Sequence, residues 1–178
     1  MAKTSVASPK FRRKVQRDDT LLSNFQLTHA VEEIMKHVRL DRTWDIPYLA
    51  GYSVDGKTVY IDRHLPRTYR SHGRTVRVDP FLILHESVEK SLVDHLHIYY
   101  QHAHQIALRA ERAAVAAADL SWRPYNQFML KFIKDAAHEK LRRVPPNLHL
   151  KPYWDEKDTA LIRAMQKAIH AELLSKKK

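Results

Sequence analysis

Residues 79–118 read DPFLILHESVEKSLVDHLHIYYQHAHQIALRAERAAVAAA, and this stretch decides the fold. The pair Asp79-Pro80 at its start favours a helix N-terminus, because Asp can cap a helix and Pro fits its first turn. No helix breaker follows as far as Leu96, and the segment from Tyr99 to Ala118 is rich in strong helix formers. The stretch therefore predicts two helices, which a bend or short loop near residues 95–99 can separate.

The first of these helices carries two ionisable side chains on an otherwise apolar face. His85 and Glu89 are four residues apart, so they project from the same side of the helix as Val88 and Leu92. Such groups are costly to bury unless they are paired, hydrogen-bonded or bound to a metal. Glu86 lies about 100° around the helix from His85.

The second helix presents a matching face, on which His104 and Glu111 interrupt small and apolar side chains. If the two helices pack antiparallel on these faces, His85, Glu89 and His104 meet, and Glu111 is either a fourth ligand or an outer partner. Three nitrogen and oxygen ligands with one open position are typical of a catalytic zinc site, and the chain has no cysteine to offer. We therefore expect Zn²⁺ or another divalent transition metal, with Glu86 as the general base.

Other histidines near this pattern are read as surface residues. His95, His97 and His102 fall on polar faces of the predicted helices, which accept histidine at little cost. His102 is the reserve ligand if the second helix is rotated. Among the tyrosines that flank the site, Tyr60 and Tyr100 can either pack in the core or donate a hydroxyl to an oxyanion, and the same holds for Tyr99.

The order His85-Glu86-x-x-Glu89 with a downstream His104 resembles a variant of the zincin metallopeptidase motif, which is His-Glu-x-x-His with a third ligand further along. The resemblance covers residues 48–111. It implies His85 and His104 as ligands, Glu86 as general base, and peptidase activity on a protein or peptide substrate. Glu89 stands where the family has its second histidine.

The residues before the motif helix predict a small antiparallel sheet. Residues 48–52 and 58–62 are β-prone, and an Asp-Gly pair between them favours a tight hairpin turn. Residues 75–78 are a third candidate strand. In zincins a strand just before the motif helix lines the substrate cleft, so the resemblance implies this role for residues 56–63.

The fold class that follows is α+β and mainly α. A flexible basic arm, residues 1–20, precedes a single domain of residues 21–178, with the metal-site core at 48–118. Ser23 or Asn24 is expected to cap the first helix.

The C-terminal part, residues 122–178, is predicted to be helical. One helix spans residues 125–142, and Pro145-Pro146 opens a linker that ends where Asp155 caps a last helix, which reaches residue 174. Five large side chains are spaced as a helix–core contact: Trp122, Tyr125, Phe128, Met129 and Phe132.

The net charge and the hydropathy of the chain indicate which classes of partner to expect. The formal net charge is +11, which suits non-specific binding of nucleic acid through basic tails and through a run of arginines between Arg63 and Arg77. No apolar run reaches the roughly 18 residues of a membrane-spanning helix, and the N-terminus lacks the apolar segment of a secretory signal. A cytoplasmic protein with no membrane partner is expected.

Three interpretations remain open from the sequence. The first is a zincin-like zinc-dependent hydrolase. The second is a non-catalytic basic domain that binds nucleic acid or protein, in which His85 is merely hydrogen-bonded and Glu89 is paired with a residue such as Arg109. The third is a metal-dependent nuclease or phosphoesterase, because a His/Glu site beside arginines also suits phosphate.

Overall fold

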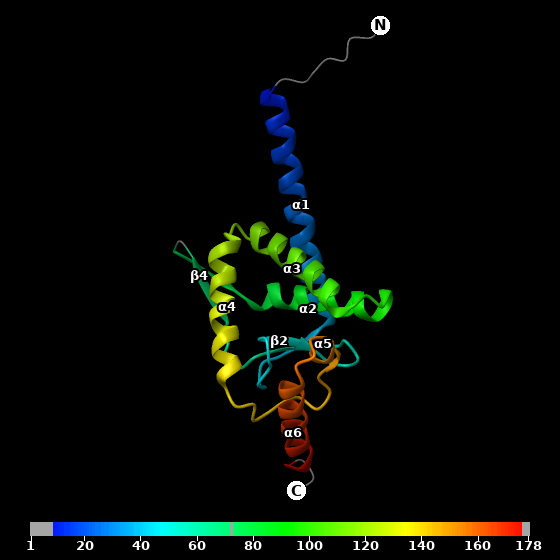
Figure 1. Cartoon of the computed structure of the whole chain (residues 1–178). Coiled ribbons are helices and arrows are strands. Elements are labelled where there is room, and N and C mark those ends of the chain that lie inside the picture. The colour runs from blue at the N-terminus through cyan, green and yellow to red at the C-terminus, as the bar shows by residue number, and fades with distance from the viewer. Residues whose placement is uncertain (1–8, 72, 176–178) are drawn as a thin grey trace.

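The computed structural model describes residues 9–71 and 73–175 and has a mainly helical α+β fold, which confirms the expected class (Figure 1). Its helices are α1 (Pro9–His37), α2 (Asp79–Leu96), α3 (Tyr100–Ala117), α4 (Trp122–His138), α5 (Lys151–Asp155) and α6 (Thr159–Ser175). None of the helices in this described part has a stretch both long and apolar enough to cross a membrane.

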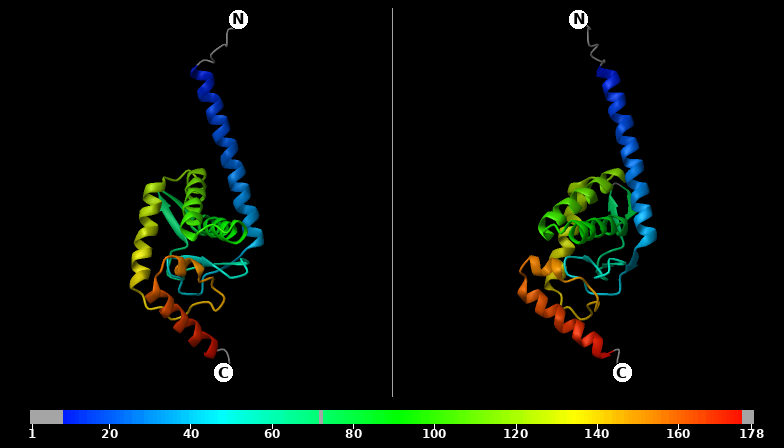
Figure 2. Two further views of the ribbon diagram at one scale, coloured as in Figure 1. Left: turned by 45° about the vertical axis from the view of Figure 1, so that its right-hand side comes forward. Right: turned by 90° about the vertical axis from the view of Figure 1, so that its right-hand side faces the viewer.

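Helix α1 extends far beyond the body of the protein, and the start of α1 and the end of α6 lie at opposite ends of the described molecule (Figure 2). The helix begins at Pro9, so residues 9–20 are helical where a flexible arm was expected, while residues 1–8 lie outside the described part. Pro9 suits a first helical turn, and no Gly or Pro interrupts the 29 residues of the helix. Only its C-terminal half reaches the body, where Val31 is buried.

The expected hairpin is present as β2 (Ala50–Tyr52) and β3 (Thr58–Ile61), which pair antiparallel around a turn where Gly56 has φ 69°. A third strand that the sequence did not indicate, β1 (Arg39–Asp41), pairs parallel with β3. The strand order is therefore β1-β3-β2, which makes β3 the central strand and β2 an edge strand.

A separate two-stranded sheet contains β4 (Thr68–Ser71) and β5 (Arg74–Arg77). Strand β5 matches the candidate strand at residues 75–78, whereas β4 was not expected. Several arginines of the basic run are paired with carboxylates: Arg63 Nε lies 2.7 Å from Asp45, and the guanidinium groups of Arg74 and Arg77 lie 3.0 Å from Asp119 and Asp79. Much of the positive charge of this run is thus matched locally.

Helix α2 starts where the sequence placed it, but Asp79 does not cap it. Val78 is the N-cap residue, and no side chain bonds there. The fully buried Asp79 carboxylate instead accepts hydrogen bonds from Arg42 at 2.5 Å and from Arg77 at 3.0 Å. At its other end, His97 adopts a left-handed conformation (φ 52°), which ends the helix and lets α3 fold back over α2.

The C-terminal region contains one helix more than expected. Helix α4 is present but ends at His138, and a coil then leads to the short α5, which ends at Asp155. Asp155 therefore does not cap the last helix. Asp158 does so, because its carboxylate accepts a 3.1 Å hydrogen bond from the backbone N–H of Leu161 in α6.

Candidate metal centre

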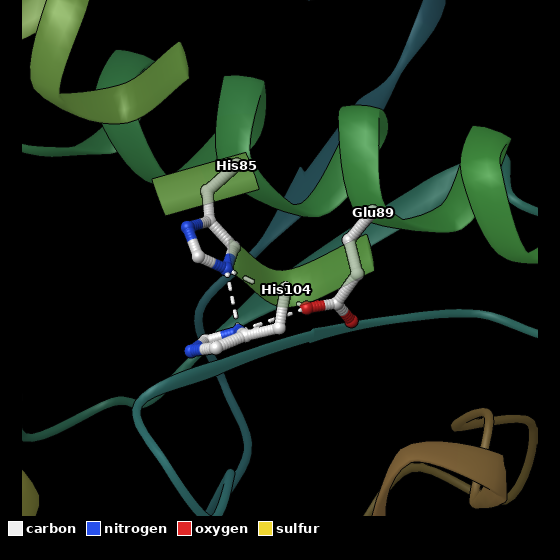
Figure 3. Close-up of side chains that lie close together, drawn as sticks. All are labelled: His85, Glu89 and His104. Atoms are coloured by element: carbon white, nitrogen blue, oxygen red, sulfur yellow. Dashed lines mark hydrogen bonds and ion pairs between the residues drawn. The ribbon is translucent and has the colours of Figure 1, made fainter. Parts of the chain in front are cut away.

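Three side chains from α2 and α3 point at one another (Figure 3). Two of them, His85 and Glu89, are buried, and His104 is partly exposed. His85 Nε2 lies 3.2 Å from His104 Nδ1, and His104 Nδ1 lies 3.0 Å from Glu89 Oε2. The third distance, from His85 Nε2 to Glu89 Oε2, is 3.6 Å. The residues His85, Glu89 and His104, hereafter the triad, are thus brought together as the helix faces predicted, and they form a group that can hold a metal ion.

The spacing of the triad fits a tetrahedral cation. Nitrogen and oxygen ligands that lie about 2.0–2.1 Å from zinc at the corners of a tetrahedron are about 3.3–3.4 Å apart. Two of the observed separations, 3.0 and 3.2 Å, are slightly shorter than this range, and the third, 3.6 Å, is slightly longer. A zinc ion therefore fits the triad with small side-chain movements, and the fourth corner remains free for water or substrate.

The protonation of His85 decides what the triad can bind. While both ring nitrogens of His85 carry protons, Nδ1 can donate to Glu111 and Nε2 can donate toward His104 and Glu89, so hydrogen bonds link the metal-free triad. Loss of the proton from Nε2 leaves a lone pair there, beside the lone pairs of Glu89 and of a neutral His104 Nδ1. A divalent cation can accept these three lone pairs at once.

Glu111 takes the second of its two expected roles, that of an outer partner. Its Oε2 lies 2.9 Å from Nδ1 of His85, the nitrogen that faces away from His104. Its Oε1 accepts a 2.8 Å hydrogen bond from the hydroxyl of Tyr125 in α4. A carboxylate in this position fixes the tautomer and orientation of a ligand histidine and raises its basicity.

The buried carboxylates set the protonation of the triad. Burial opposes a charge on His85, but its hydrogen bonds to Glu111 and Glu89 outweigh burial and raise the pKa of His85 to about 10. For Glu89 burial again favours the neutral form, yet the nearby imidazoles of His104 and His85 prevail and lower its pKa. The metal-free site thus holds a proton on His85 beside an ionised Glu89.

Glu86 is a buried carboxylate that has no ion pair or hydrogen bond within the described part of the chain. It is 7 % exposed. Burial and the neighbouring Glu89 charge raise its pKa to about 8. A carboxyl group in this state can accept and release a proton near neutral pH, which is what a general base requires.

A cavity of about 220 Å³ is lined by the triad, Glu86 and Glu111, together with residues of α4 and α5. Strand β2 contributes Tyr52 to it, α3 contributes Tyr100, and the segment around α5 contributes His149 and Tyr153. Within the described chain, His149 Nδ1 is buried without a hydrogen-bond partner. The hydroxyl of Tyr52 is buried near the Glu89 carboxylate, and burial together with that charge raises the pKa of Tyr52. Lysine and arginine are absent from the described lining.

Several expected site features are placed elsewhere. His102, His95 and His97 are exposed, so the reserve ligand His102 does not join the triad. Arg109 is exposed too, and Glu89 faces His104 instead.

The tyrosines and strands near the cavity also differ from expectation. Tyr99 is 74 % exposed, and the hydroxyl of Tyr60 donates to Asn147 at 2.6 Å, so only Tyr100 of the three tyrosines lines the cavity. Edge strand β2 lines it in place of residues 56–63, because β3 is central in the sheet.

Sequence reasoning missed three residues of the site. Tyr125 was read as a core contact, which its burial supports, but helix periodicity cannot show that its hydroxyl holds Glu111. Tyr52 lay in a predicted strand, and strand alternation does not say what its tip faces. His149 lies in coil 45 residues after His104. It is tied to the site by its backbone N–H, which donates to Tyr52 O at 2.9 Å, and by its ring, which lies 5.4 Å from the Tyr52 ring between centroids.

Comparisons of the chain with protein-family models, with curated proteins and with solved structures found no match. The geometry of the site is therefore the basis for any statement about function.

Proposed function

We propose that this protein is a zinc-dependent hydrolase that cleaves peptide bonds. The observation that carries the proposal is the triad of His85, Glu89 and His104, whose three ligand atoms lie 3.0 to 3.6 Å apart beside the unpaired carboxylate of Glu86. His85 and Glu89 are buried, and His104 is partly exposed. When bound, zinc supplies Lewis acidity, which polarises a carbonyl oxygen and makes a water molecule easier to deprotonate.

In this proposal each side chain of the site has its own role. His85, Glu89 and His104 hold the cation, and Glu111 keeps His85 Nε2 free to bind by fixing a proton on Nδ1. Glu86 takes the proton from the attacking water and returns it to the leaving amine. A cation nearby favours the ionised form of Glu86, which offsets the rise in its pKa to about 8 that burial and Glu89 cause.

The cavity supports a peptide over a phosphodiester as substrate. Sites that act on phosphoryl groups use Arg, Lys or additional metal ions to neutralise the charged oxygens. The described cavity lining has no Arg or Lys, and its charged groups are the carboxylates and imidazoles of the site. An amide carries no net charge, so it enters such a cavity without an unpaired ion.

The test is metal analysis combined with peptide hydrolysis on the full chain. We expect about one equivalent of zinc in the wild-type protein, loss of zinc in His85→Ala, and retained zinc without turnover in Glu86→Gln. Glu32→Gln on the exposed surface of α1 is the matched control and keeps both properties. Wild-type protein that binds no zinc at micromolar concentration, or Glu86→Gln with full turnover, would contradict the proposal.

A further inference from the structure

One wall of the cavity is apolar and comes mainly from α4. Its side chains are Trp122, Met129, Leu130 and Ile133 of α4, joined by Leu82 of α2 and Leu108 of α3. We call these six residues the α4 wall. Within the described lining, Asn126 is the polar residue that α4 adds.

The α4 wall includes apolar surface that the fold leaves uncovered. Tyr125 and Met129 are buried, and Tyr125 packs against the rings of Tyr69 and Phe81. Leu130 lines the cavity yet is 45 % exposed. The uncovered part of Leu130 is apolar surface at the cavity, where it can contact an apolar group that enters.

The size of the cavity limits what that group can be. Pockets for whole small-molecule ligands are usually about 300–1,000 Å³. The cavity here is about 220 Å³, and the triad occupies part of its lining. It therefore suits one side chain of a longer substrate whose main chain continues outside.

Resting on the proposed hydrolase, we propose that the substrates are peptides that place a large apolar side chain, such as Leu or Phe, against the α4 wall next to the bond that is cleaved. The cavity is continuous with the triad, so an apolar side chain on the wall and a carbonyl at the triad belong to neighbouring residues of one chain. A Lys or Asp side chain at this position would lose its hydration without gaining an ionic partner.

The expected preference is large enough to measure. A hydrophobic pocket discriminates by roughly 10–200-fold for each methylene gained or lost. A peptide with Leu at the preferred position should therefore be cleaved at least about tenfold faster, by kcat/KM, than the same peptide with Ala. Peptides with Lys or Asp there should be cleaved more slowly still.

The experiment uses the zinc-loaded full chain and an equimolar mixture of peptides that differ at one position, with cleavage followed by mass spectrometry. Leu130→Asp places a carboxylate on the α4 wall, and because the side chain is 45 % exposed, the change is compatible with folding. We expect this variant to lose the preference for Leu over Ala and to gain cleavage of the Lys peptide. Leu173→Asp in α6 is the matched control, since Leu173 is also 45 % exposed and does not line the cavity.

The outcomes separate this inference from the proposed function. A preference for Leu that Leu130→Asp abolishes and Leu173→Asp retains supports the inference. Zinc-bound protein that cleaves peptides in a Glu86-dependent way, but with no apolar preference or with one that Leu130→Asp leaves unchanged, overturns the inference and leaves the hydrolase intact. Protein without zinc or without Glu86-dependent cleavage overturns both.

Discussion

His85 Nδ1 donates a 2.9 Å hydrogen bond to Glu111 Oε2, and the two side chains, one from α2 and one from α3, are both buried. This bond commits one nitrogen of His85 to the protein and leaves the other to face His104 and Glu89. In the proposed metal site this bond would fix the tautomer of a ligand histidine.

The first prediction concerns that carboxylate. Glu111→Gln keeps the volume of the side chain and an oxygen that can accept from His85, but it removes the charge. We expect zinc affinity to fall by about 10–100-fold, since outer partners of ligand histidines contribute that much. Competition with a chromophoric chelator measures it, and Glu33→Gln on α1 serves as control. An unchanged dissociation constant would show that Glu111 is only a packing residue.

A second prediction compares a buried tyrosine with an exposed one. Tyr125 donates to Glu111 at 2.8 Å, whereas Tyr99 is 74 % exposed. Removing a buried donor leaves a buried acceptor unsatisfied and costs about 1–3 kcal/mol, while an exposed hydroxyl is solvated by water and its removal costs little. Urea denaturation in the presence of a chelator should show that Tyr125→Phe lowers the free energy of unfolding and Tyr99→Phe does not. Equal losses in both variants would refute the difference.

The third prediction is that zinc binding releases protons. The carboxylates of Glu111 and Glu89 outweigh burial and raise the pKa of His85 to about 10, so the metal-free protein at pH 7 holds a proton that ligation must displace. Affinity should therefore rise with pH up to about 10. Calorimetry in buffers of different ionisation enthalpy should give at least about one proton per zinc. A binding enthalpy that is independent of the buffer would contradict this.

The same raised pKa has an opposite effect on the metal-free fold. Because His85 binds its proton more tightly in the folded chain than at the ordinary pKa of 6.5, this proton stabilises the fold fully below that pH. The stabilisation is lost as pH rises through about 10. In chelator, His85→Gln should therefore flatten the pH dependence of the free energy of unfolding between these two values.

The sequence predicted the triad because two regular helices carry it. His85 and Glu89 are one turn apart, so a helix periodicity places them on one face with no knowledge of the rest of the fold. The left-handed His97 then reverses the chain within a few residues, which makes the pairing with His104 a local event. Short sequence separation and regular periodicity are what made this part of the site predictable.

What surrounds the triad was not predictable in the same way. Tyr52 and His149 are joined by a hydrogen bond between backbone groups 97 residues apart, and no local pattern encodes such a contact. Strand β1 has only three residues and pairs parallel with β3, so it lacks the length and alternation by which strands are found. From the sequence, the start of the first helix was placed too late, because the first residues of α1 are polar and show no apolar period. Polarity alone does not prevent a helix in a segment that lacks breakers.

The last prediction follows from the misread start of α2. Asp79 is fully buried and pairs with Arg42, whose side chain is 5 % exposed. Asp79→Asn would leave the Arg42 guanidinium buried without a counter-ion, and breaking a buried pair in this way costs about 3–5 kcal/mol. Asp119→Asn is the control, because the pair of Asp119 with Arg74 is largely exposed and such pairs contribute little. Urea denaturation in chelator should show a large loss of stability for the first variant and little change for the second. If Asp79→Asn were as stable as wild type, the residue would be acting as an ordinary helix-terminal side chain, as the sequence alone had indicated, and the pairing with Arg42 would have no energetic weight.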